Sequence, residues 1–292
     1  MPTRTVNEGF SVFHKWLTPT STESEAAQRH RASIEACLKR NFGMYRFFRS
    51  GSFGNGTSIS GHSDVDYFAW LPYDSVSSSS SKALTQVRDV LDIRFPRTGV
   101  RVNCPAVKVP FGWQAKENTE VVPAIYHGDT DDGYDIYAIP NCQDGWMKSS
   151  PDAHNAYVTS VNKSLGGKVK PLIRFIKAWK YYQNVPISSF YLELRVAKYA
   201  AEQSVIIYDL DVQWMLARLH RDGLAKMQDP MGISGYISPC STSHKLEDAK
   251  SKLSTAVTRA NKAAAAKQKG DILDTFAWWK ILYNGHFPSY YY

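Results

Sequence analysis

Two aspartates separated by one residue form the most informative pattern in this sequence. Asp64 and Asp66 stand in DVDYFAWLP, a stretch rich in aromatic and branched residues that is typical of a strand. Residues two apart in a strand point to the same face, where two carboxylates repel each other unless a cation lies between them. Magnesium and manganese prefer such oxygen ligands, and two ions about 3.5–4 Å apart can clamp the attacking and leaving oxygens of a phosphoryl transfer. Taken alone, Asp-x-Asp is more often an exposed strand edge, so the surrounding residues decide the interpretation.

A glycine-serine pair upstream supports the phosphate interpretation. Gly51 and Ser52 follow a strand-like stretch, twelve to thirteen residues before the acids. There, backbone N–H groups and a hydroxyl can meet a triphosphate. Gly54 and Gly56 add room for close backbone approach. No Gly-Lys-Ser/Thr follows, so the segment is not a P-loop.

The third carboxylate of such a site has to come from a neighbouring strand. Glu120 begins the strand-like run TEVVPAI and is the preferred candidate. It would complete the metal site and help to deprotonate the attacking hydroxyl. An exposed acid at a strand end is the alternative for Glu120, and Asp135 in YDIYAIP is the competing candidate for the site.

Several residues of the second half are candidates for substrate contact. Lys177 lies at the edge of an apolar helical stripe, where it would face a cleft and offer a point charge to phosphates; an ordinary solvated lysine is the alternative. Ser188 and Ser189 can cap a helix, whose N-terminus attracts anions. Phe190 or Tyr191, just beyond, would stack on a base, with buried core aromatics as the alternative.

The first half, which holds the acids, mixes helices and strands. A capping pattern and apolar spacing predict a helix over residues 19–42, and a second helix is expected at about 82–94. Strands are expected at residues 44–50, 64–72, 100–109, 119–125 and 134–140.

From Gly166 onward the pattern changes to helix. Apolar residues from Val169 to Trp179 form one stripe, and further helices are expected at about 190–203, 209–222, 242–268 and 271–283. We therefore expect an α+β protein with a catalytic unit at residues 1–165 and a helical lobe at residues 166–292. The active site is expected in a cleft between them.

The overall composition suits an anionic ligand. The chain has 35 basic and 27 acidic residues, which give a net charge of +8 and a pI near 9.2. This charge fits nucleotide phosphates, nucleic acid or an acidic membrane surface, and a well-solvated basic protein is the alternative. The four cysteines lack zinc-ligand spacing and fit a reducing compartment better than a disulfide framework. Because neither a signal peptide nor a run of about 20 apolar residues is found, we expect a cytoplasmic protein.

Together and in this order, these segments resemble the superfamily of oligoadenylate synthetases and cyclic GMP-AMP synthase. They look closest to its bacterial branch, the cyclic-oligonucleotide synthases called CD-NTases. The resemblance runs from about residue 45 to 203 and is specific as a combination, although no single motif is. The matching segments are Gly51-Ser52, Gly56-Thr57, Ser63 to Asp66, Glu120 to Ala124, Leu172 to Trp179 and Ser189 to Leu194, with Trp146, Ser150-Pro151 and His154 as bacterial features and Gln228 to Pro230 as weaker support.

The resemblance implies a polymerase β-like nucleotidyltransferase core with a helical lobe. Asp64 and Asp66 would hold two Mg²⁺ ions, with Mn²⁺ as an alternative, and Glu120 would join the ion under the acceptor hydroxyl. The implied substrate contacts are the Gly51-Ser52 turn, Lys177 and Ser189 for the triphosphate, and Phe190 for a nucleobase.

By the same resemblance, the chain would condense nucleoside triphosphates (ATP, GTP or pyrimidine nucleotides) into a cyclic di- or trinucleotide and release pyrophosphate. The product would activate an effector protein in bacterial antiphage defence. No membrane partner is expected, and nucleic acid is an optional partner. Linear oligonucleotide synthesis or nucleotide addition to RNA or protein is one alternative, and an inactive nucleic-acid-binding module is another.

One position departs from the family pattern. The family usually has aspartate where this chain has Glu120, and the additional methylene moves the carboxylate by about 1.5 Å. The longer side chain would change the metal geometry or favour manganese. The sequence also lacks the Cys/His zinc insertion of the animal DNA sensor, so recognition of double-stranded DNA by that route has no support.

Overall fold

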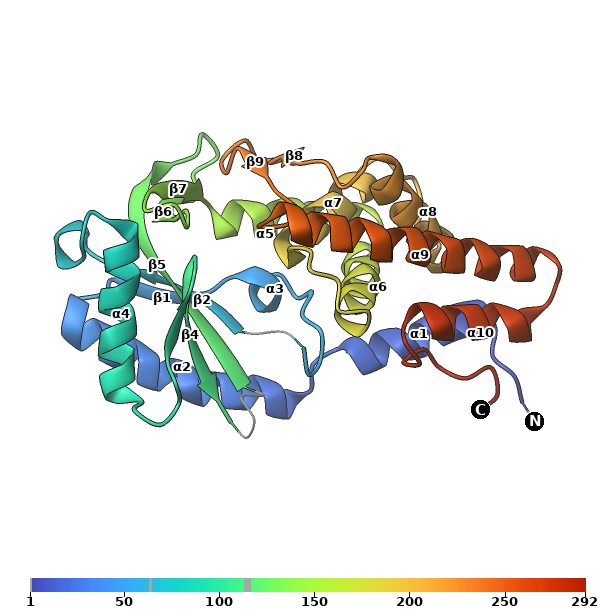
Figure 1. The fold of residues 1–292 in the computed structure, drawn as a ribbon, viewed down its shortest axis with the longest axis horizontal. Coiled ribbons are helices and arrows are strands. Elements are labelled where there is room, and N and C mark those ends of the chain that lie inside the picture. The colour runs from blue at the N-terminus through green and yellow to red at the C-terminus, as the bar shows by residue number, and fades with distance from the viewer. Residues whose placement is uncertain (1, 63–64, 113–116) are drawn as a thin grey trace.

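The structure is a computed structural model that describes residues 2–62, 65–112 and 117–292. The chain has the predicted α+β fold, with a mixed sheet at one end and a helical lobe at the other (Figure 1). The helices are α1 (Val6–Leu17), α2 (Ser21–Phe42), α3 (Gly51–Gly54), α4 (Ser80–Arg94), α5 (Pro151–Ser164), α6 (Val169–Tyr182), α7 (Ser189–Ala200), α8 (Tyr208–Arg221), α9 (Ser243–Gln268) and α10 (Ile272–Leu282), with a 3-10 turn η1 (Tyr73–Ser75). The strands are β1 (Arg46–Arg49), β2 (Val65–Trp70), β3 (Arg101–Asn103), β4 (Ala106–Phe111), β5 (Glu117–Asp129), β6 (Asp135–Pro140), β7 (Trp146–Ser149), β8 (Met227–Gln228) and β9 (Tyr236–Ile237).

A seven-stranded mixed sheet organises the first half of the chain. Five strands run in the order β1-β2-β5-β4-β3, while β6 pairs with β5 and β7 pairs with β6. The neighbours β2 and β5 are parallel, and the other pairs in this sheet are antiparallel. The parallel register places Asp66 beside Glu120.

The two faces of this sheet have different surroundings. Val65, Tyr67 and Ala69 of β2 are buried in a hydrophobic cluster that α2 and α4 complete from one side. Because side chains alternate along a strand, Asp66 and Phe68 point to the other face. Phe68 belongs to a separate, smaller hydrophobic cluster there. The acid of β2 therefore points away from α2 and α4.

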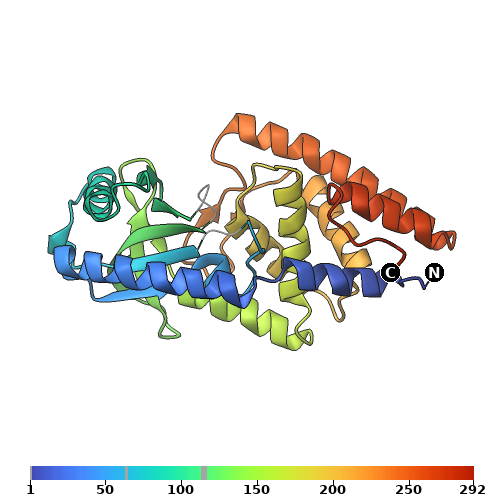
Figure 2. The ribbon, with the colours of Figure 1, turned by 90° about the horizontal axis from the view of Figure 1, so that it is seen from below.

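The helical lobe has its own large hydrophobic core, and the N-terminal helix is part of it. Helix α1 begins with a capping box between Thr5 and Glu8. Its Phe10 packs edge-on against Phe175 of α6 and Trp279 of α10, with ring centroids 5.0 and 5.2 Å apart. Helix α1 consequently lies beside α10 (Figures 1 and 2).

Helices α1 and α5 were not predicted from the sequence. Helix α5 begins with Ser150 as its cap and Pro151 in its first turn. Both helices pack into the core formed by the C-terminal helices. Two helices from the first 165 residues thus contribute to the helical lobe, while the division of the chain at residues 165 and 166 stays a prediction.

Two features of the sheet region correct the sequence interpretation. Residues 100–109 form the hairpin of β3 and β4, with a turn at Cys104 and Pro105, instead of one strand. Cys104 is bonded to Cys142, so the expectation against a disulfide is wrong for this pair. Within the described residues, no helix is both long and apolar enough to cross a membrane.

Candidate active site

Asp66 and Glu120 lie side by side on the sheet face that points away from α2 and α4. They are register partners on the parallel strands β2 and β5, and neighbouring strands lie about 4.8 Å apart. Both side chains are half-buried. Two carboxylates at this spacing repel each other unless they share a cation. Glu120 therefore lies on the strand next to that of Asp66, and its role as the third acid stays a prediction.

Asp135, the competing candidate, lies elsewhere. It is on β6, opposite Asp129, which is nine residues along β5 from Glu120, or roughly 30 Å at the rise of an extended chain. Its carboxylate accepts a hydrogen bond from Tyr137 at 2.8 Å and lies 3.5 Å from Arg46. Asp135 therefore lies far along the sheet from Asp66 and Glu120.

The glycine-serine turn adjoins Asp66. The backbone N–H of Ser50 donates to the carbonyl of Asp66 at 2.9 Å, which joins the end of β1 to the start of β2. Gly51 then takes a φ of +56°, in the left-handed region that favours glycine, and the single turn α3 begins. Ser52 follows in this turn and is half-buried. The predicted phosphate turn and the predicted metal ligand are therefore neighbours.

Lys177 is at the centre of a buried polar network that joins α6 and α7 to the segment after the turn. Its Nζ donates to the carbonyl of Thr57 at 3.0 Å and lies 3.5 Å from Glu193 of α7. The same carboxylate accepts hydrogen bonds from the Thr57 hydroxyl, at 2.6 Å, and from the Asn55 amide. Burial lowers the pKa of Lys177, while the charges of Glu193 and Asp66 oppose that shift. A solvated lysine is excluded, because the side chain is 0% exposed.

Ser189 contacts a different lysine. Ser188 caps α7 as predicted, and the hydroxyl of Ser189 accepts a hydrogen bond from Nζ of Lys180 at 2.5 Å. The Tyr181 hydroxyl lies 3.2 Å from the same oxygen. Lys180 is half-buried and stands three residues after Lys177 on α6. Lys180 thus places an ammonium group beside the Ser189 hydroxyl, a contact that sequence analysis did not predict.

Phe190 is the exposed aromatic of the two candidates for base stacking. It is 39% exposed, and its ring meets His154 edge to face at 5.1 Å. His154 lies 2.9 Å from a carboxylate oxygen of Asp229. Tyr191 is fully buried, and its hydroxyl donates to the carbonyl of Ala225 at 2.7 Å. Tyr191 is therefore a core residue, which leaves Phe190 as the candidate.

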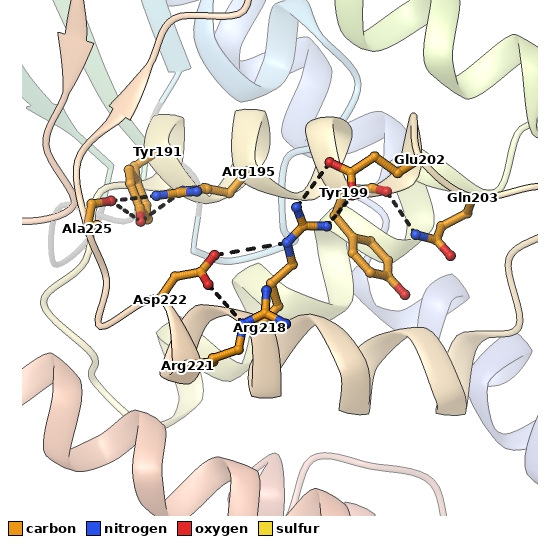
Figure 3. A network of polar contacts seen from close by, with 9 residues as sticks. All are labelled: Tyr191, Arg195, Tyr199, Glu202, Gln203, Arg218, Arg221, Asp222 and Ala225. Carbon is orange, nitrogen blue, oxygen red and sulfur yellow. Dashed lines mark hydrogen bonds and ion pairs between the residues drawn. The ribbon is translucent and has the colours of Figure 1, made fainter.

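Figure 3 shows the polar contacts that join α7, α8 and the residues that follow each of these helices. Arg195 donates to the carbonyl of Ala225 at 2.6 Å. Arg218 of α8 binds both carboxylate oxygens of Glu202, at 2.5 and 3.0 Å, and lies 4.0 Å from Asp222. A two-pronged arginine-carboxylate pair fixes geometry as well as charge. These contacts anchor α7, which carries Ser189 and Phe190 in its first turn.

The oxygen donors of Asp66 and Glu120 fit a hard divalent cation such as Mg²⁺ or Mn²⁺. Asp64, the further predicted ligand, lies outside the residues that the structure describes. Across the described residues, no group of three or more His, Cys, Asp or Glu side chains is placed so that it could hold a metal ion. The roles of Asp66, Glu120 and Asp64 as metal ligands therefore stay predictions.

A family model for the Second Messenger Oligonucleotide or Dinucleotide Synthetase domain (SMODS) matches residues 4–162, more than half of the chain. The chain belongs to the SMODS family. The matched region contains the glycine-serine turn and all three predicted acids. The resemblance to the bacterial cyclic-oligonucleotide synthases is therefore confirmed.

Relatives of this SMODS protein agree with that assignment. The cyclic AMP-AMP-AMP synthase of an Acinetobacter species is 31% identical over 196 residues, which are 62% of this chain and 54% of the relative. The chain thus spans about half the length of that relative.

Solved structures share the fold of the SMODS chain. Escherichia coli CdnC, solved with ATP, has a TM-score of 0.74 at 17% identity, and the match covers 97% of this chain and 99% of that one. Vibrio cholerae DncV, a cyclic AMP-GMP synthase solved with a linear intermediate, has a TM-score of 0.65 at 16% identity, covering 84% and 70%. At these identities the likeness establishes the architecture alone.

The candidate site contains residues that sequence analysis missed. Lys180 carried a visible signal, since it lies on the same helix as Lys177. Asn103 and Lys108 carried none, because their position beside Glu120 depends on the register of the β3–β4 hairpin.

Pockets are found in the helical lobe, within the part of the chain that the structure describes. One is lined by Lys198 and residues 228–232, and another includes Gln183, Arg259 and Lys280. Neither includes a predicted site residue, so the active-site cleft stays a prediction.

Proposed function

We propose that this SMODS protein is a metal-dependent nucleotidyltransferase that condenses nucleoside triphosphates into a cyclic di- or trinucleotide and releases pyrophosphate. The observation that carries the proposal is the alignment of Asp66 with Glu120 beside the Gly51 turn. This arrangement combines a place for divalent cations with a backbone turn suited to phosphate.

The acids are assigned as metal ligands. Asp64 and Asp66 would hold two Mg²⁺ or Mn²⁺ ions, and Glu120 would complete the ion site next to the acceptor hydroxyl. When bound, such ions polarise phosphoryl oxygens and lower the pKa of an attacking hydroxyl. The protein's own contribution is to keep Asp66 and Glu120 on one sheet face, at a fixed register.

The substrate contacts are assigned to the turn and to the helical lobe. Gly51 and Ser52 would meet the triphosphate from the sheet side. Ser189 would meet it from the helical side, together with Lys180, which already contacts the Ser189 hydroxyl. The buried ammonium of Lys177 would add positive charge from behind the segment after the turn, where it donates to the Thr57 carbonyl.

The contact with the nucleobase is assigned to Phe190. This side chain is exposed at the first turn of α7, where it can stack on a nucleobase.

The distribution of charge along the chain also supports binding of triphosphates. Residues 166–292 contain 18 basic and 10 acidic residues, whereas residues 1–165 contain 17 of each. The whole net charge of +8 therefore belongs to the second part of the chain, and it would attract triphosphates.

The choice of substrate follows the relatives. Because the Acinetobacter relative is a cyclic AMP-AMP-AMP synthase and CdnC was solved with ATP, we assign ATP as one substrate. The product would activate an effector protein in antiphage signalling. Nucleoside triphosphates are abundant in the cytoplasm, which is where we place the activity.

The test is incubation with labelled ribonucleoside triphosphates and Mg²⁺ or Mn²⁺, followed by phosphatase. A small phosphatase-resistant product supports the proposal, and a ladder of linear products would replace it with the linear alternative. Asp66→Asn should abolish product formation. Asp135→Asn is the matched control, since that acid lies on another strand and should leave the product unchanged. No incorporation by the folded protein under any of these conditions would contradict the proposal and favour an inactive nucleic-acid-binding module.

A further inference from the structure

A row of four charged residues crosses the sheet at the candidate site. Asp66 on β2 is the register partner of Glu120 on β5, Glu120 is the partner of Lys108 on β4, and Lys108 is the partner of Arg101 on β3. Register partners share a face, so two acids and two bases follow one another along one line. Glu120 is where the acidic half of the row meets the basic half.

Two side chains on the β3–β4 hairpin contact the carboxylate of Glu120. The amide nitrogen of Asn103 donates to its Oε1 at 2.8 Å. The ammonium of Lys108 lies 3.8 Å from the same oxygen. The side chains of Lys108 and Glu120 are only 16% and 19% exposed, so water weakens this ion pair less than it would at an open surface. Both contacts reach Glu120 from the side opposite to Asp66, because β4 and β2 flank β5.

The hydrogen bond with Asn103 depends on the length of the glutamate side chain. An aspartate at position 120 would withdraw its carboxylate by about 1.5 Å, beyond hydrogen-bond distance from that amide. The glutamate also has one more rotatable bond to immobilise, which costs conformational entropy unless a partner fixes it. A neutral amide can hold a carboxylate in place without neutralising it, as a metal ligand requires.

We infer that Asn103 is a positioning residue that, together with Lys108, fixes the orientation of the Glu120 carboxylate at the proposed metal site. The inference rests on the proposed function. Residues that orient a metal ligand typically contribute 10–100-fold to metal affinity. The hairpin thus adapts the site to a glutamate.

The test measures metal binding directly. Mn²⁺ binding to the full chain is followed by electron paramagnetic resonance in the presence of a non-hydrolysable ATP analogue. Asn103→Ala should weaken Mn²⁺ binding by about 10-fold or more, while the affinity for the analogue at saturating Mn²⁺ stays within about twofold. Val102→Ala is the matched control, because it shortens a neighbouring side chain on the opposite face of β3 and should leave Mn²⁺ binding unchanged.

A double-variant comparison separates this role from a general weakening of the hairpin. In a Glu120→Asp background the hydrogen bond is already lost, so adding Asn103→Ala should have almost no further effect. A full additional 10-fold loss in that background would overturn the inference, as would unchanged Mn²⁺ binding in the single variant Asn103→Ala. If instead Glu120→Ala leaves Mn²⁺ binding unchanged, the proposed metal site itself fails.

Discussion

Gly51 lies so close to the carboxylate of Asp66 that a Cβ atom at this glycine would stand 2.0 Å from Oδ2. A side chain at position 51 fits only if the Asp66 carboxylate moves, and the backbone there has the positive φ that glycine tolerates best. The turn predicted to contact phosphate and the predicted metal ligand therefore form one packed unit.

A substitution at Gly51 should accordingly affect catalysis more than folding. We expect Gly51→Ala to lower the turnover rate by about 100-fold or more, because the methyl group must displace the Asp66 carboxylate by an ångström or more. Steady-state kinetics with ATP and a thermal melt measure the two effects. Gly133→Ala is the matched control: its φ is also positive, at +79°, but nothing lies within 4 Å of the added atom. Equal loss of activity in both variants would contradict the account, since strain alone would then explain it.

Loss of the Lys177 ammonium should destabilise the protein. Lys177→Met leaves the buried Glu193 without its cationic partner, which costs about 3–5 kcal/mol in comparable buried pairs. Urea denaturation measures the free energy of unfolding. The double variant Lys177→Met/Glu193→Gln removes both charges and should recover part of the loss. If the free energy of unfolding of Lys177→Met lies within about 1 kcal/mol of that of the original protein, the ion pair with Glu193 does not stabilise the fold as described.

The contact between His154 and Asp229 should make stability depend on acid pH. Burial alone would raise the pKa of Asp229, but the hydrogen bond and charge of His154 and the N–H groups of Ser234 and Met231 lower it to about 2. A carboxyl group with a depressed pKa stabilises the folded state above its unfolded pKa, near 3.8, and this contribution is lost as the pH falls toward 2.

The free energy of unfolding should thus fall between pH 4 and pH 2 partly through Asp229. Urea denaturation at pH 5 and pH 3 should show a smaller decrease for Asp229→Asn than for the original chain. At pH 7 the same variant should be less stable, by about 1.5–3 kcal/mol for lost charge-assisted hydrogen bonds. An unchanged pH dependence in Asp229→Asn would remove this carboxylate from the explanation.

The disulfide between Cys104 and Cys142 should be detectable and stabilising. Alkylation of the denatured, unreduced protein should label two cysteines, Cys37 and Cys240, and mass spectrometry should find the other two joined. Cys104→Ser/Cys142→Ser should lower the free energy of unfolding by about 4 kcal/mol, as loop-closure entropy predicts for a sequence separation of 38. Labelling of all four cysteines before reduction would rule out the bond.

Much of the site could be read from local patterns. The alternation around Asp66 and the apolar run after Glu120 each indicate a strand, and a glycine-serine pair indicates a turn; these signals depend only on near neighbours in the chain. Such a pattern favours Glu120 over Asp135, and the register of β5 with β2 supports this prediction.

The rest depends on contacts between distant segments. The burial of Lys177 requires Glu193 and Thr57 to meet it, 16 residues ahead and 120 behind in the chain. The joining of Cys104 to Cys142 likewise requires two turns of the sheet to meet. Helix α1 shows apolar residues at helical spacing, yet its place beside α10 follows only from packing.

The central claim is that Asp66 and Glu120 together hold divalent cations beside the bound triphosphate. The direct test is a crystal structure with Mn²⁺ and a non-hydrolysable ATP analogue, with anomalous scattering used to locate manganese. We predict manganese within about 2.5 Å of carboxylate oxygens of both residues. Manganese bound only to phosphates or elsewhere on the chain, with either carboxylate more than about 4 Å from every ion, would contradict the account.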